Sequence, residues 1–328
     1  MIALALQDQS QVSETRRRAT EMAQRQGFGD IDSGRVALVA TELATNILKH
    51  GGGGEVLVGA YGEGPDSGIE LIALDRGPGI ANLAASFADG YSTAATAGKG
   101  LGAIVRQSHF VDFASWPGNG TAILARLKKG PLSEGFRDSS QIGAVSVPKL
   151  GEDICGDSWS VSVGPDETTL LVADGLGHGP EAAEAAVEAV RLFHRFNGHR
   201  TSVLLEYIHG GLRATRGAAV SVARFQPGSG KMIYSGVGNI VGVIAANGEL
   251  RRMVSMPGTA GHNARKIQAF EYPFTAGLVI LHSDGIASSW TLDRYANLAA
   301  RHPTLIAAVL YRDLTRRRDD ATVLVAKW

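Results

Sequence analysis

Residues 170–179 read LLVADGLGHG, an apolar run that ends abruptly in an aspartate and a series of glycines. The apolar run has the composition of a buried β-strand, and the glycines are typical of a tight turn. Asp174 is therefore expected where a rigid strand meets an exposed loop. Its carboxylate is an oxygen ligand of the kind that Mg²⁺ and Mn²⁺ prefer. We expect this segment to supply both a strand of the fold and one side chain of a metal site.

Three further segments in the second half of the chain place an aspartate beside a strand-like run. Asp157 lies in CGDSW just before SWSVSV, Asp284 lies in LVILHSDGI, and Asp319 lies in RRRDDATVLV. One aspartate at a strand end is ordinary turn chemistry. Four that converge would form an all-oxygen site for two divalent cations, which activate water and neutralise phosphoryl oxygens during the hydrolysis of a phosphate ester.

Composition limits the classes of function. The 328 residues include 32 basic and 32 acidic side chains, so the chain offers no electrostatic reason to expect a nucleic acid or an anionic membrane as partner. The single cysteine, Cys155, excludes an internal disulfide framework and fits a cytoplasmic location. We interpret it as a packing residue. No apolar run approaches the ~20 residues of a membrane span, and the N-terminus lacks the pattern of a signal peptide.

The chain length predicts two domains. The polar segment KKGPLSEGFRDSSQ lacks periodicity and is the best candidate for the linker between them. We expect an α+β protein with one domain over residues 1–128, a linker over 129–141 and a second domain over 142–328. In the second domain, two long helical patterns and several strand-like runs predict a layered arrangement of helices and sheet.

A predicted helix in the first domain, over residues 33–50, carries polar residues at intervals of four. They are Glu42, Asn46 and His50, and this spacing places them in one stripe on the helix surface. A carboxylate and an amide oxygen one turn apart can serve as a general base and as a magnesium ligand. This stripe is the first part of a candidate nucleotide site.

Downstream, the segment LDRGPGI places Asp75 at the end of a strand-like run. An ionised carboxylate there can accept a hydrogen bond from an exocyclic amine such as that of adenine. Gly77 and Gly79 would let the backbone approach the ring closely. Asp75 is therefore the candidate residue for recognising the base.

The segment AGKGLGA opens another predicted helix, and glycine amides at a helix N-terminus can hold a phosphate. It is not a P-loop, because the lysine is followed by glycine rather than by serine or threonine. The candidate phosphate-binding residues are Gly98, Lys99, Gly100, Leu101 and Gly102.

The order of TELATNILKH, LDRGPGI, GKGLG and GNGTAI resembles the N, G1 and G2 boxes of the GHKL ATPase superfamily. Within it, these motifs look most like those of the small serine kinases of bacterial partner-switching systems. The resemblance covers nearly all of residues 1–127 and implies an α/β sandwich that binds ATP with Mg²⁺. It implies that Glu42 is the catalytic base, Asn46 a magnesium ligand and Asp75 the adenine-binding residue. Thr121 would lie near the adenine.

The order of GDSW, VADGLGHG, SDGI and DDATVLV resembles the PPM-type protein serine/threonine phosphatases, and DGLGHG is closest to their SpoIIE-like branch. The resemblance covers roughly residues 141–328 and implies a β-sandwich flanked by helices. It implies two Mn²⁺ or Mg²⁺ ions, with Asp174 bridging them as the central catalytic ligand. The other implied ligands are Asp157, the Gly175 carbonyl, Asp284 and Asp319.

Two assignments in the phosphatase motifs have alternatives. Asp320 directly follows Asp319, and we favour the first of the pair as the ligand. His178 in GLGHG has two open roles, to orient water at the metal ions or to stabilise its own loop.

Together the resemblances imply a regulatory enzyme of a bacterial partner-switching system. The second domain would dephosphorylate a phosphoserine on a STAS-domain anti-anti-sigma or switch protein, and the first would phosphorylate a serine of the same module. The alternative is a first domain without catalytic activity that senses nucleotide or binds a switch protein, a sigma factor or an anti-sigma factor. Unregulated, the two activities would only consume ATP, so we hypothesise that nucleotide, partner or dimerisation gates one of them. A homodimer is left open.

Overall fold

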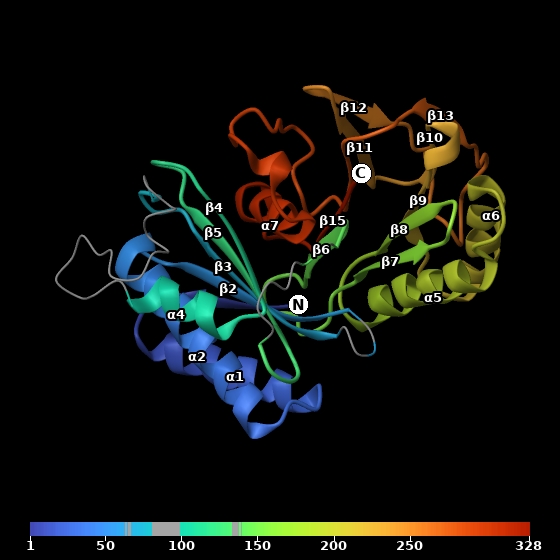
Figure 1. Cartoon of the computed structure of the whole chain (residues 1–328). Coiled ribbons are helices and arrows are strands. Elements are labelled where there is room, and N and C mark those ends of the chain that lie inside the picture. The colour runs from blue at the N-terminus through green and yellow to red at the C-terminus, as the bar shows by residue number, and fades with distance from the viewer. Residues whose placement is uncertain (63, 65–66, 81–98, 133–137, 139) are drawn as a thin grey trace. The chain divides into compact units, whose positions relative to one another are not determined.

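The computed structural model describes residues 1–62, 64, 67–80, 99–132, 138 and 140–328 (Figure 1). These residues form two compact units. The first unit comprises Met1–Ser140 and Leu292–Arg312, and the second comprises Gln141–Thr291 and Asp313–Trp328. The segment Leu292–Arg312 thus belongs to the first unit by its contacts, although it follows the phosphatase motif SDGI in the sequence.

The first unit contains a five-stranded antiparallel sheet in the order β1-β2-β3-β5-β4. Its strands are β1 (Ile2–Leu6), β2 (Gly54–Tyr61), β3 (Gly68–Asp75), β4 (Phe110–Ser115) and β5 (Thr121–Lys128). Its helices are α1 (Ser10–Arg25), α2 (Asp30–Asn46), the π-helical turn η1 (Ile47–Gly51), α4 (Lys99–Gln107), the 3₁₀ turn η5 (Leu298–Ala300) and most of α7 (Pro303–Leu314).

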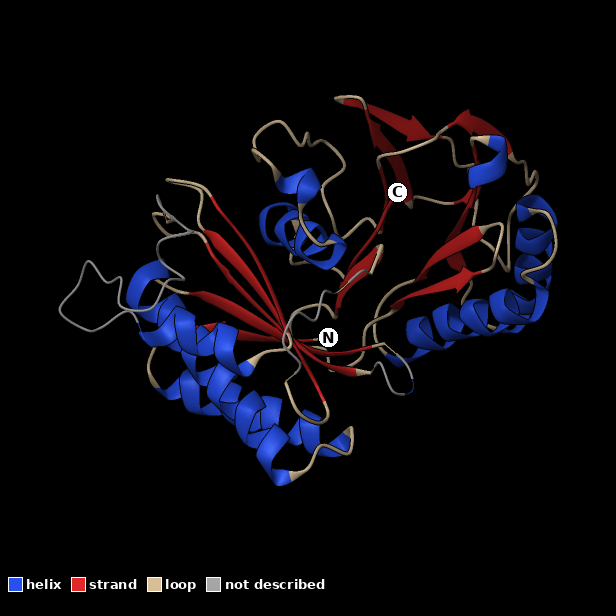
Figure 2. Cartoon of the chain, viewed as in Figure 1, coloured by secondary structure: helices blue, strands red, loops and turns tan. Residues whose placement is uncertain are grey.

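Both faces of this sheet are buried. Side chains alternate between the two faces of a strand, so Val56 on β2 faces α1 and α2 while Leu57 points the other way. Leu57, Ile72 and Leu124 on the second face have no exposed surface. Figure 2 shows α1, α2 and α4 on one side of this sheet and α7 on the other. A sheet covered on both sides explains why β3 and β5 are nearly continuous runs of buried residues.

The second unit contains two five-stranded antiparallel sheets, in the orders β13-β10-β9-β8-β7 and β12-β11-β14-β15-β6. Its strands are β6 (Ile142–Val147), β7 (Asp157–Val163), β8 (Thr168–Gly175), β9 (Ala218–Gln226), β10 (Lys231–Val237), β11 (Val241–Ala246), β12 (Glu249–Met253), β13 (Phe270–Pro273), β14 (Leu278–His282) and β15 (Ala321–Lys327). Its helices are α5 (Pro180–Phe196) and α6 (Thr201–Gly211), with 3₁₀ turns η3 (Leu212–Ala214) and η4 (Pro227–Ser229).

The side chains of residues 170–173, the run LLVA, belong alternately to two hydrophobic cores. Leu170 and Val172 on β8 join the core between the two sheets, where Leu324 of β15 also lies. Leu171 and Ala173 point the opposite way and pack under α5 and α6. Four successive apolar residues are therefore needed, because both faces of this strand are buried. The predicted α+β class, with a β-sandwich flanked by helices, is confirmed.

Some elements differ from the sequence-based expectation. The helix expected over residues 33–50 begins earlier, at Asp30, and its α-helical part ends at Asn46, where η1 begins. Helix α1 was not predicted, because its buried stripe consists of one valine and small residues within a mostly charged segment. The strands β1, β12 and β13 were also missed, and each of them is only four or five residues long.

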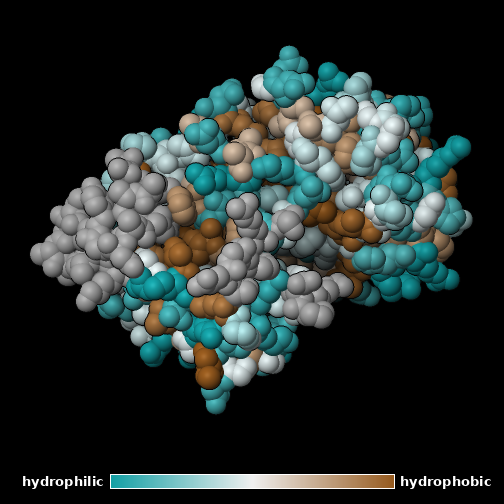
Figure 3. Space-filling model, viewed as in Figure 1, coloured by the Kyte–Doolittle hydropathy of each residue, from teal (hydrophilic) through white to brown (hydrophobic). Residues whose placement is uncertain are grey.

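Among the described residues, no helix is long and apolar enough to cross a membrane. Figure 3 shows hydrophilic residues over much of the region where α5 lies in Figure 1. This agrees with the exposed charged side chains of that helix, such as Glu181 and Arg191.

Two glycines of the PGNG turn provide a matched test of close backbone packing. Gly118 and Gly120 have nearly the same positive φ, 76° and 75°, but a Cβ at Gly120 would lie 2.1 Å from the Asp75 carbonyl oxygen, whereas nothing lies within 4 Å at Gly118. We expect Gly118→Ala to lower the free energy of unfolding by about 1 kcal/mol, because alanine disfavours a positive φ. Gly120→Ala should lower it by about 3 kcal/mol, because the new Cβ also collides with the Asp75 carbonyl. Urea denaturation checks this, and equal losses would contradict it.

Candidate functional site

Helices α2 and α4 bring three of the predicted nucleotide-binding residues together. A Cβ at Gly100 would lie 2.9 Å from Glu42 Oε2 and 3.2 Å from Asn46 Oδ1. The glycine therefore leaves open the space in front of both side chains. Asn46 Nδ2 is buried and has no hydrogen-bond partner among the described residues. A buried donor without a partner is costly, so a bound ligand or water at this point would stabilise it.

A second group of predicted residues surrounds the end of β3. Asp75 Oδ1 accepts hydrogen bonds from the backbone N–H of Gly77 at 2.9 Å and of Thr121 at 3.2 Å. Burial raises the pKa of Asp75, and these two hydrogen bonds oppose that shift. A Cβ at Gly77 would lie 2.7 Å from the Gly51 Cα, so the backbone after η1 passes directly against this turn. One oxygen of Asp75 is thus held in place by the turn and by the start of β5.

The remaining predicted nucleotide-binding residues are placed as follows. His50 is exposed on η1, so the α-helical spacing that aligns Glu42 with Asn46 does not continue to it. Gly79 has a φ of 72° and lies against the backbone of Trp116. Helix α4 begins at Lys99, Leu101 packs on the apolar core, Gly102 is buried, and Gly98 lies outside the described residues.

In the second unit, the ends of β8 and β14 and the start of β15 meet at a cavity of about 400 Å³. Three predicted metal ligands, Asp174, Asp284 and Asp319, line this cavity. Asp157 lies opposite Asp174 in the register of β7 and β8, and only 4% of its surface is exposed. The four predicted carboxylates are therefore brought into one region by strand ends from distant parts of the sequence.

The Asp157 and Asp174 carboxylates repel each other. Burial and the charges of Asp157, Asp284 and Asp319 raise the pKa of Asp174 to about 9. Burial likewise raises the pKa of Asp157 to about 7, with the Asp320 and Asp319 carboxylates adding to the effect. Asp157 Oδ1 is also buried without a hydrogen-bond partner in the part of the chain that is described. An acceptor-only cluster of this kind fits divalent cations, which would relieve both the repulsion and the unpaired oxygen.

Within the described ranges, no three acidic, histidine or cysteine side chains form a complete cage around one point. This arrangement still suits Mg²⁺, because that ion keeps several waters and takes only one or two carboxylates from the protein. The backbone carbonyl of Gly175 is the further predicted ligand. A Cβ at this residue would lie 2.0 Å from the Ala182 carbonyl oxygen, so only glycine fits where β8 meets α5.

The adjacent Asp319 and Asp320 have different surroundings. Asp319 lines the cavity, whereas Asp320 is buried and accepts a hydrogen bond of 2.8 Å from the Lys149 N–H. His178 Nδ1 lies 2.9 Å from Glu152 Oε1, so this histidine contacts a side chain of the loop before β7. These contacts favour Asp319 as the cavity ligand and give His178 a partner that holds its loop.

Two polar residues that the sequence analysis missed support the carboxylates directly. Asn239 Nδ2 donates a hydrogen bond of 2.7 Å to Asp284 Oδ2, and the Ser283 hydroxyl donates one of 2.6 Å to Asp157 Oδ2. Asn239 follows β10 and the positive-φ Gly238, so it shares the strand-end signal of the aspartates. A pattern of acidic residues at strand ends does not include it, because its side chain is an amide.

These folds and sites define a histidine kinase-like ATPase domain followed by a PPM-type serine/threonine phosphatase domain. The family model for Stage II sporulation protein E matches residues 164–328, and that for the histidine kinase-like ATPase domain matches residues 5–127. The chain therefore belongs to the SpoIIE family, and it carries an additional ATPase domain. Both resemblances identified from the motifs are confirmed.

Individual relatives agree with this division. The first domain is 34% identical over 104 residues to the serine/threonine-protein kinase RsbT of Bacillus subtilis (strain 168), covering 32% of this chain and 78% of RsbT. A solved chain described as "The bacterial stressosome: a modular system that has been adapted to control secondary messenger signaling" is 29% identical, with a TM-score of 0.53, covering 57% of this chain and 98% of that one. The structure of RsbX in complex with magnesium has a similar fold, with 22% identity and a TM-score of 0.50. The match covers 58% of this chain and 97% of RsbX.

Metal binding can be measured without activity. We expect Mn²⁺ to raise the melting temperature of the wild-type chain, because an ion that binds only the folded state stabilises it. Asp174→Asn should lose most of this shift, while Asp166→Asn, which changes an exposed loop residue, should keep it. Differential scanning fluorimetry over a Mn²⁺ titration checks this. An undiminished shift in Asp174→Asn would remove Asp174 from the metal site.

Proposed function

We propose that the second unit removes phosphate from a phosphoserine on a STAS-domain partner, and that the first unit binds ATP with Mg²⁺ and phosphorylates a serine of the same signalling module. The observation that carries the phosphatase proposal is the cavity in which Asp174, Asp284 and Asp319 meet beside the buried Asp157. Membership of the SpoIIE family supports the reaction class, and the similarity to RsbT supports the kinase.

In the phosphatase, Asp157, Asp174, Asp284, Asp319 and the Gly175 carbonyl would hold two Mn²⁺ or Mg²⁺ ions. When bound, such ions supply activated water and neutralise charge on the phosphoryl group. The protein's own contribution is to fix the ligands. Asn239 orients the Asp284 carboxylate through its 2.7 Å hydrogen bond, and the Ser283 hydroxyl does the same for Asp157.

Beyond the carboxylates, the cavity is lined by both apolar and polar residues. Leu176 and Pro257 line it together with Asn239 and Thr259. A phosphoserine in an extended peptide suits this composition, because its phosphate is anionic and the adjoining backbone needs hydrogen-bonding partners. The STAS-domain partner is proposed from the resemblance to SpoIIE-like phosphatases and partner-switching kinases, and the similarity to the kinase RsbT and to a chain of the bacterial stressosome supports a signalling module of that kind.

In the first unit, Glu42 would act as general base and Asn46 Oδ1 as a ligand of the nucleotide's Mg²⁺. Both face the open space at Gly100, at the start of α4, where backbone N–H groups are available for phosphate. Asp75 would accept a hydrogen bond from the adenine amine on the oxygen that the turn leaves available.

Transfer of labelled phosphate from ATP tests the kinase. With the STAS partner encoded at the neighbouring locus, the wild-type chain should phosphorylate a serine, and Glu42→Ala should lower the rate at least 100-fold because the base is lost. Glu21→Ala on the exposed side of α1 serves as control. A stable complex without transfer by the wild type would overturn the kinase assignment in favour of a non-catalytic binding module.

The phosphatase is tested by hydrolysis of the same phosphorylated partner. Asn239→Ala should raise the Mn²⁺ concentration for half-maximal activity about 10-fold, because an outer partner of a metal ligand is lost, and leave the KM for the phosphoprotein nearly unchanged. A Mn²⁺ dependence identical to that of the wild type would contradict the role given to Asn239.

A further inference from the structure

The second face of the β1–β5 sheet carries charged residues in a buried position. Glu70 and Arg126 lie opposite each other in the register of β3 and β5, and each side chain is 5% exposed. Arg126 also lies opposite Phe110 of β4, whose ring is 5.3 Å from that of His302. A guanidinium and a carboxylate on a buried face need partners that satisfy their remaining donors and acceptors.

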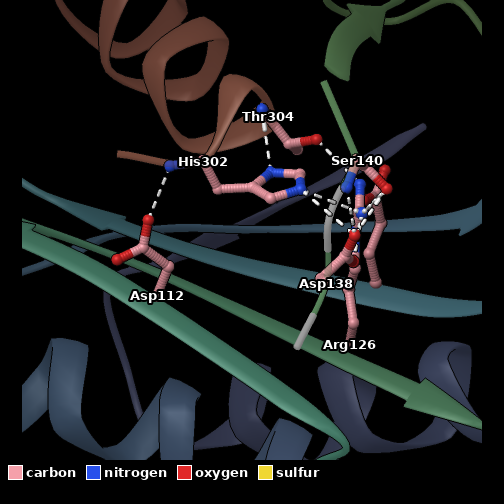
Figure 4. A network of polar contacts seen from close by, with 7 residues as sticks. Asp112, Arg126, Asp138, Ser140, His302 and Thr304 are labelled. Atoms are coloured by element: carbon pink, nitrogen blue, oxygen red, sulfur yellow. Dashed lines mark hydrogen bonds and ion pairs between the residues drawn. The ribbon is translucent and has the colours of Figure 1, made fainter. Parts of the chain in front are cut away.

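Those partners come from the segment Leu292–Arg312 and from the end of the linker (Figure 4). Arg126 donates to Glu70 at 2.9 Å, to Asp138 at 2.6 Å and to the Thr304 hydroxyl at 2.8 Å. Burial lowers the pKa of Arg126, but the two carboxylates raise it by more, so the guanidinium stays charged. The Arg126 cluster, defined as Glu70, Arg126, Asp138, His302 and Thr304, is therefore closed by two residues from the far end of the chain.

His302 is held from both sides of its ring and by its backbone. Its N–H donates to Asp112 Oδ2 at 2.7 Å, and its Nδ1 accepts from the Thr304 N–H at 3.1 Å. Its Nε2 lies 3.2 Å from Arg126 Nη1 and 3.7 Å from Asp138 Oδ1. Asp112 also pairs with Arg301 at 3.2 Å. The chain just before α7 is thus fixed to β4 by specific hydrogen bonds.

The other end of the segment reaches the proposed adenine-binding turn. Arg312 is 2% exposed, and its Nη1 donates a hydrogen bond of 3.0 Å to the backbone carbonyl of Asp75. In return, the Arg76 guanidinium donates to the Arg312 carbonyl. Arg312 therefore contacts the Asp75 backbone and the Arg76 side chain, next to the carboxylate that would bind the base.

Directly after Arg312, the chain enters the second unit and pairs with the loop of a predicted metal ligand. The Leu314 carbonyl accepts from the Ala287 N–H at 2.8 Å, and the Arg316 N–H donates to the Gly285 carbonyl at 2.8 Å. Gly285 follows Asp284, and Asp319 lies three residues beyond Arg316. One short stretch of chain is thus hydrogen-bonded to the Asp75 turn at its beginning and to the Asp284 loop at its end.

We propose that Leu292–Arg312, although it lies in the phosphatase sequence, is a docked part of the ATP-binding unit. Arg312 positions the Asp75 turn. Through this contact, nucleotide binding is energetically linked to metal binding at the cavity. This rests on the proposed function, because it takes Asp75 as the base-binding residue and Asp284 as a metal ligand. Linkage is reciprocal, so a cation that orders the Asp284 loop changes nucleotide affinity by the same factor as nucleotide changes cation affinity.

The test measures ADP affinity of the full-length chain by calorimetry at constant Mg²⁺, with and without Mn²⁺. In the wild type, Mn²⁺ should change the ADP dissociation constant by about 5-fold or more. Asp174→Asn should show no such change, which assigns the effect to the cavity. Arg312→Met should weaken ADP binding about 10-fold and abolish the Mn²⁺ effect. Arg318→Met removes an exposed guanidinium nearby and should behave as the wild type.

Asp112→Asn provides a second variant that contacts neither Asp75 nor the cavity, and it should reduce the Mn²⁺ effect while circular dichroism shows a folded chain. Tight ADP binding by the wild type with no response to Mn²⁺, and with equal affinity in Arg312→Met, would overturn the inference and leave the proposed nucleotide site intact. Failure of the wild type to bind ADP would overturn the nucleotide site itself and the inference with it.

Discussion

Mutual repulsion among buried carboxylates is the constraint on which the catalytic half of this protein depends. Asp157 and Asp174 face each other across neighbouring strands, where both are largely removed from water. Flexible loops would let such charges separate, whereas the pairing of β7 with β8, a strand buried on both faces, holds them together. The Ser283 hydroxyl and the Asn239 amide then hold the Asp157 and Asp284 oxygens in place by hydrogen bonds. The fold thus maintains an arrangement that becomes favourable when divalent ions bind.

The nucleotide half uses a different physical device. Its predicted site is formed mostly by backbone that approaches other backbone closely, at Gly51, Gly77 and Gly120. One oxygen of Asp75 is fixed there by two N–H groups. Where the phosphatase gathers several aspartates for metal ions, the predicted nucleotide site combines backbone N–H groups with a few separate acceptors, for a ligand that brings its own phosphates and Mg²⁺. The two chemistries need opposite electrostatics, which explains why they occupy separate units.

Features that depend on sequence neighbours could be predicted, and features that depend on distant partners could not. An aspartate that adjoins an apolar run marks a strand end, so the three aspartates that line the cavity, at 174, 284 and 319, could be predicted from local pattern alone. The same pattern gave no reason to choose Asn239, whose role exists only because it meets Asp284. Likewise, the spacing of Glu42 and Asn46 follows from a regular helix, but the π-helical turn that contains His50 does not. The apolar residues of α7 are typical of a buried helix, yet nothing local indicates which sheet it covers.

Buried charge best explains why α7 lies at this particular position on the β1–β5 sheet. Apolar side chains such as Leu305 and Ile306 would pack acceptably on many apolar surfaces, because hydrophobic burial is not directional. Arg126 is different, since leaving its charge buried without partners would cost about 3–5 kcal/mol. His302 and Thr304 complete its surroundings only in one register along β4 and β5. The Arg126 cluster therefore adds little net stability compared with an apolar core, but it penalises every other placement of the helix. This placement also puts Arg312 at the Asp75 turn, where a small shift in position would change the affinity for nucleotide at the proposed site.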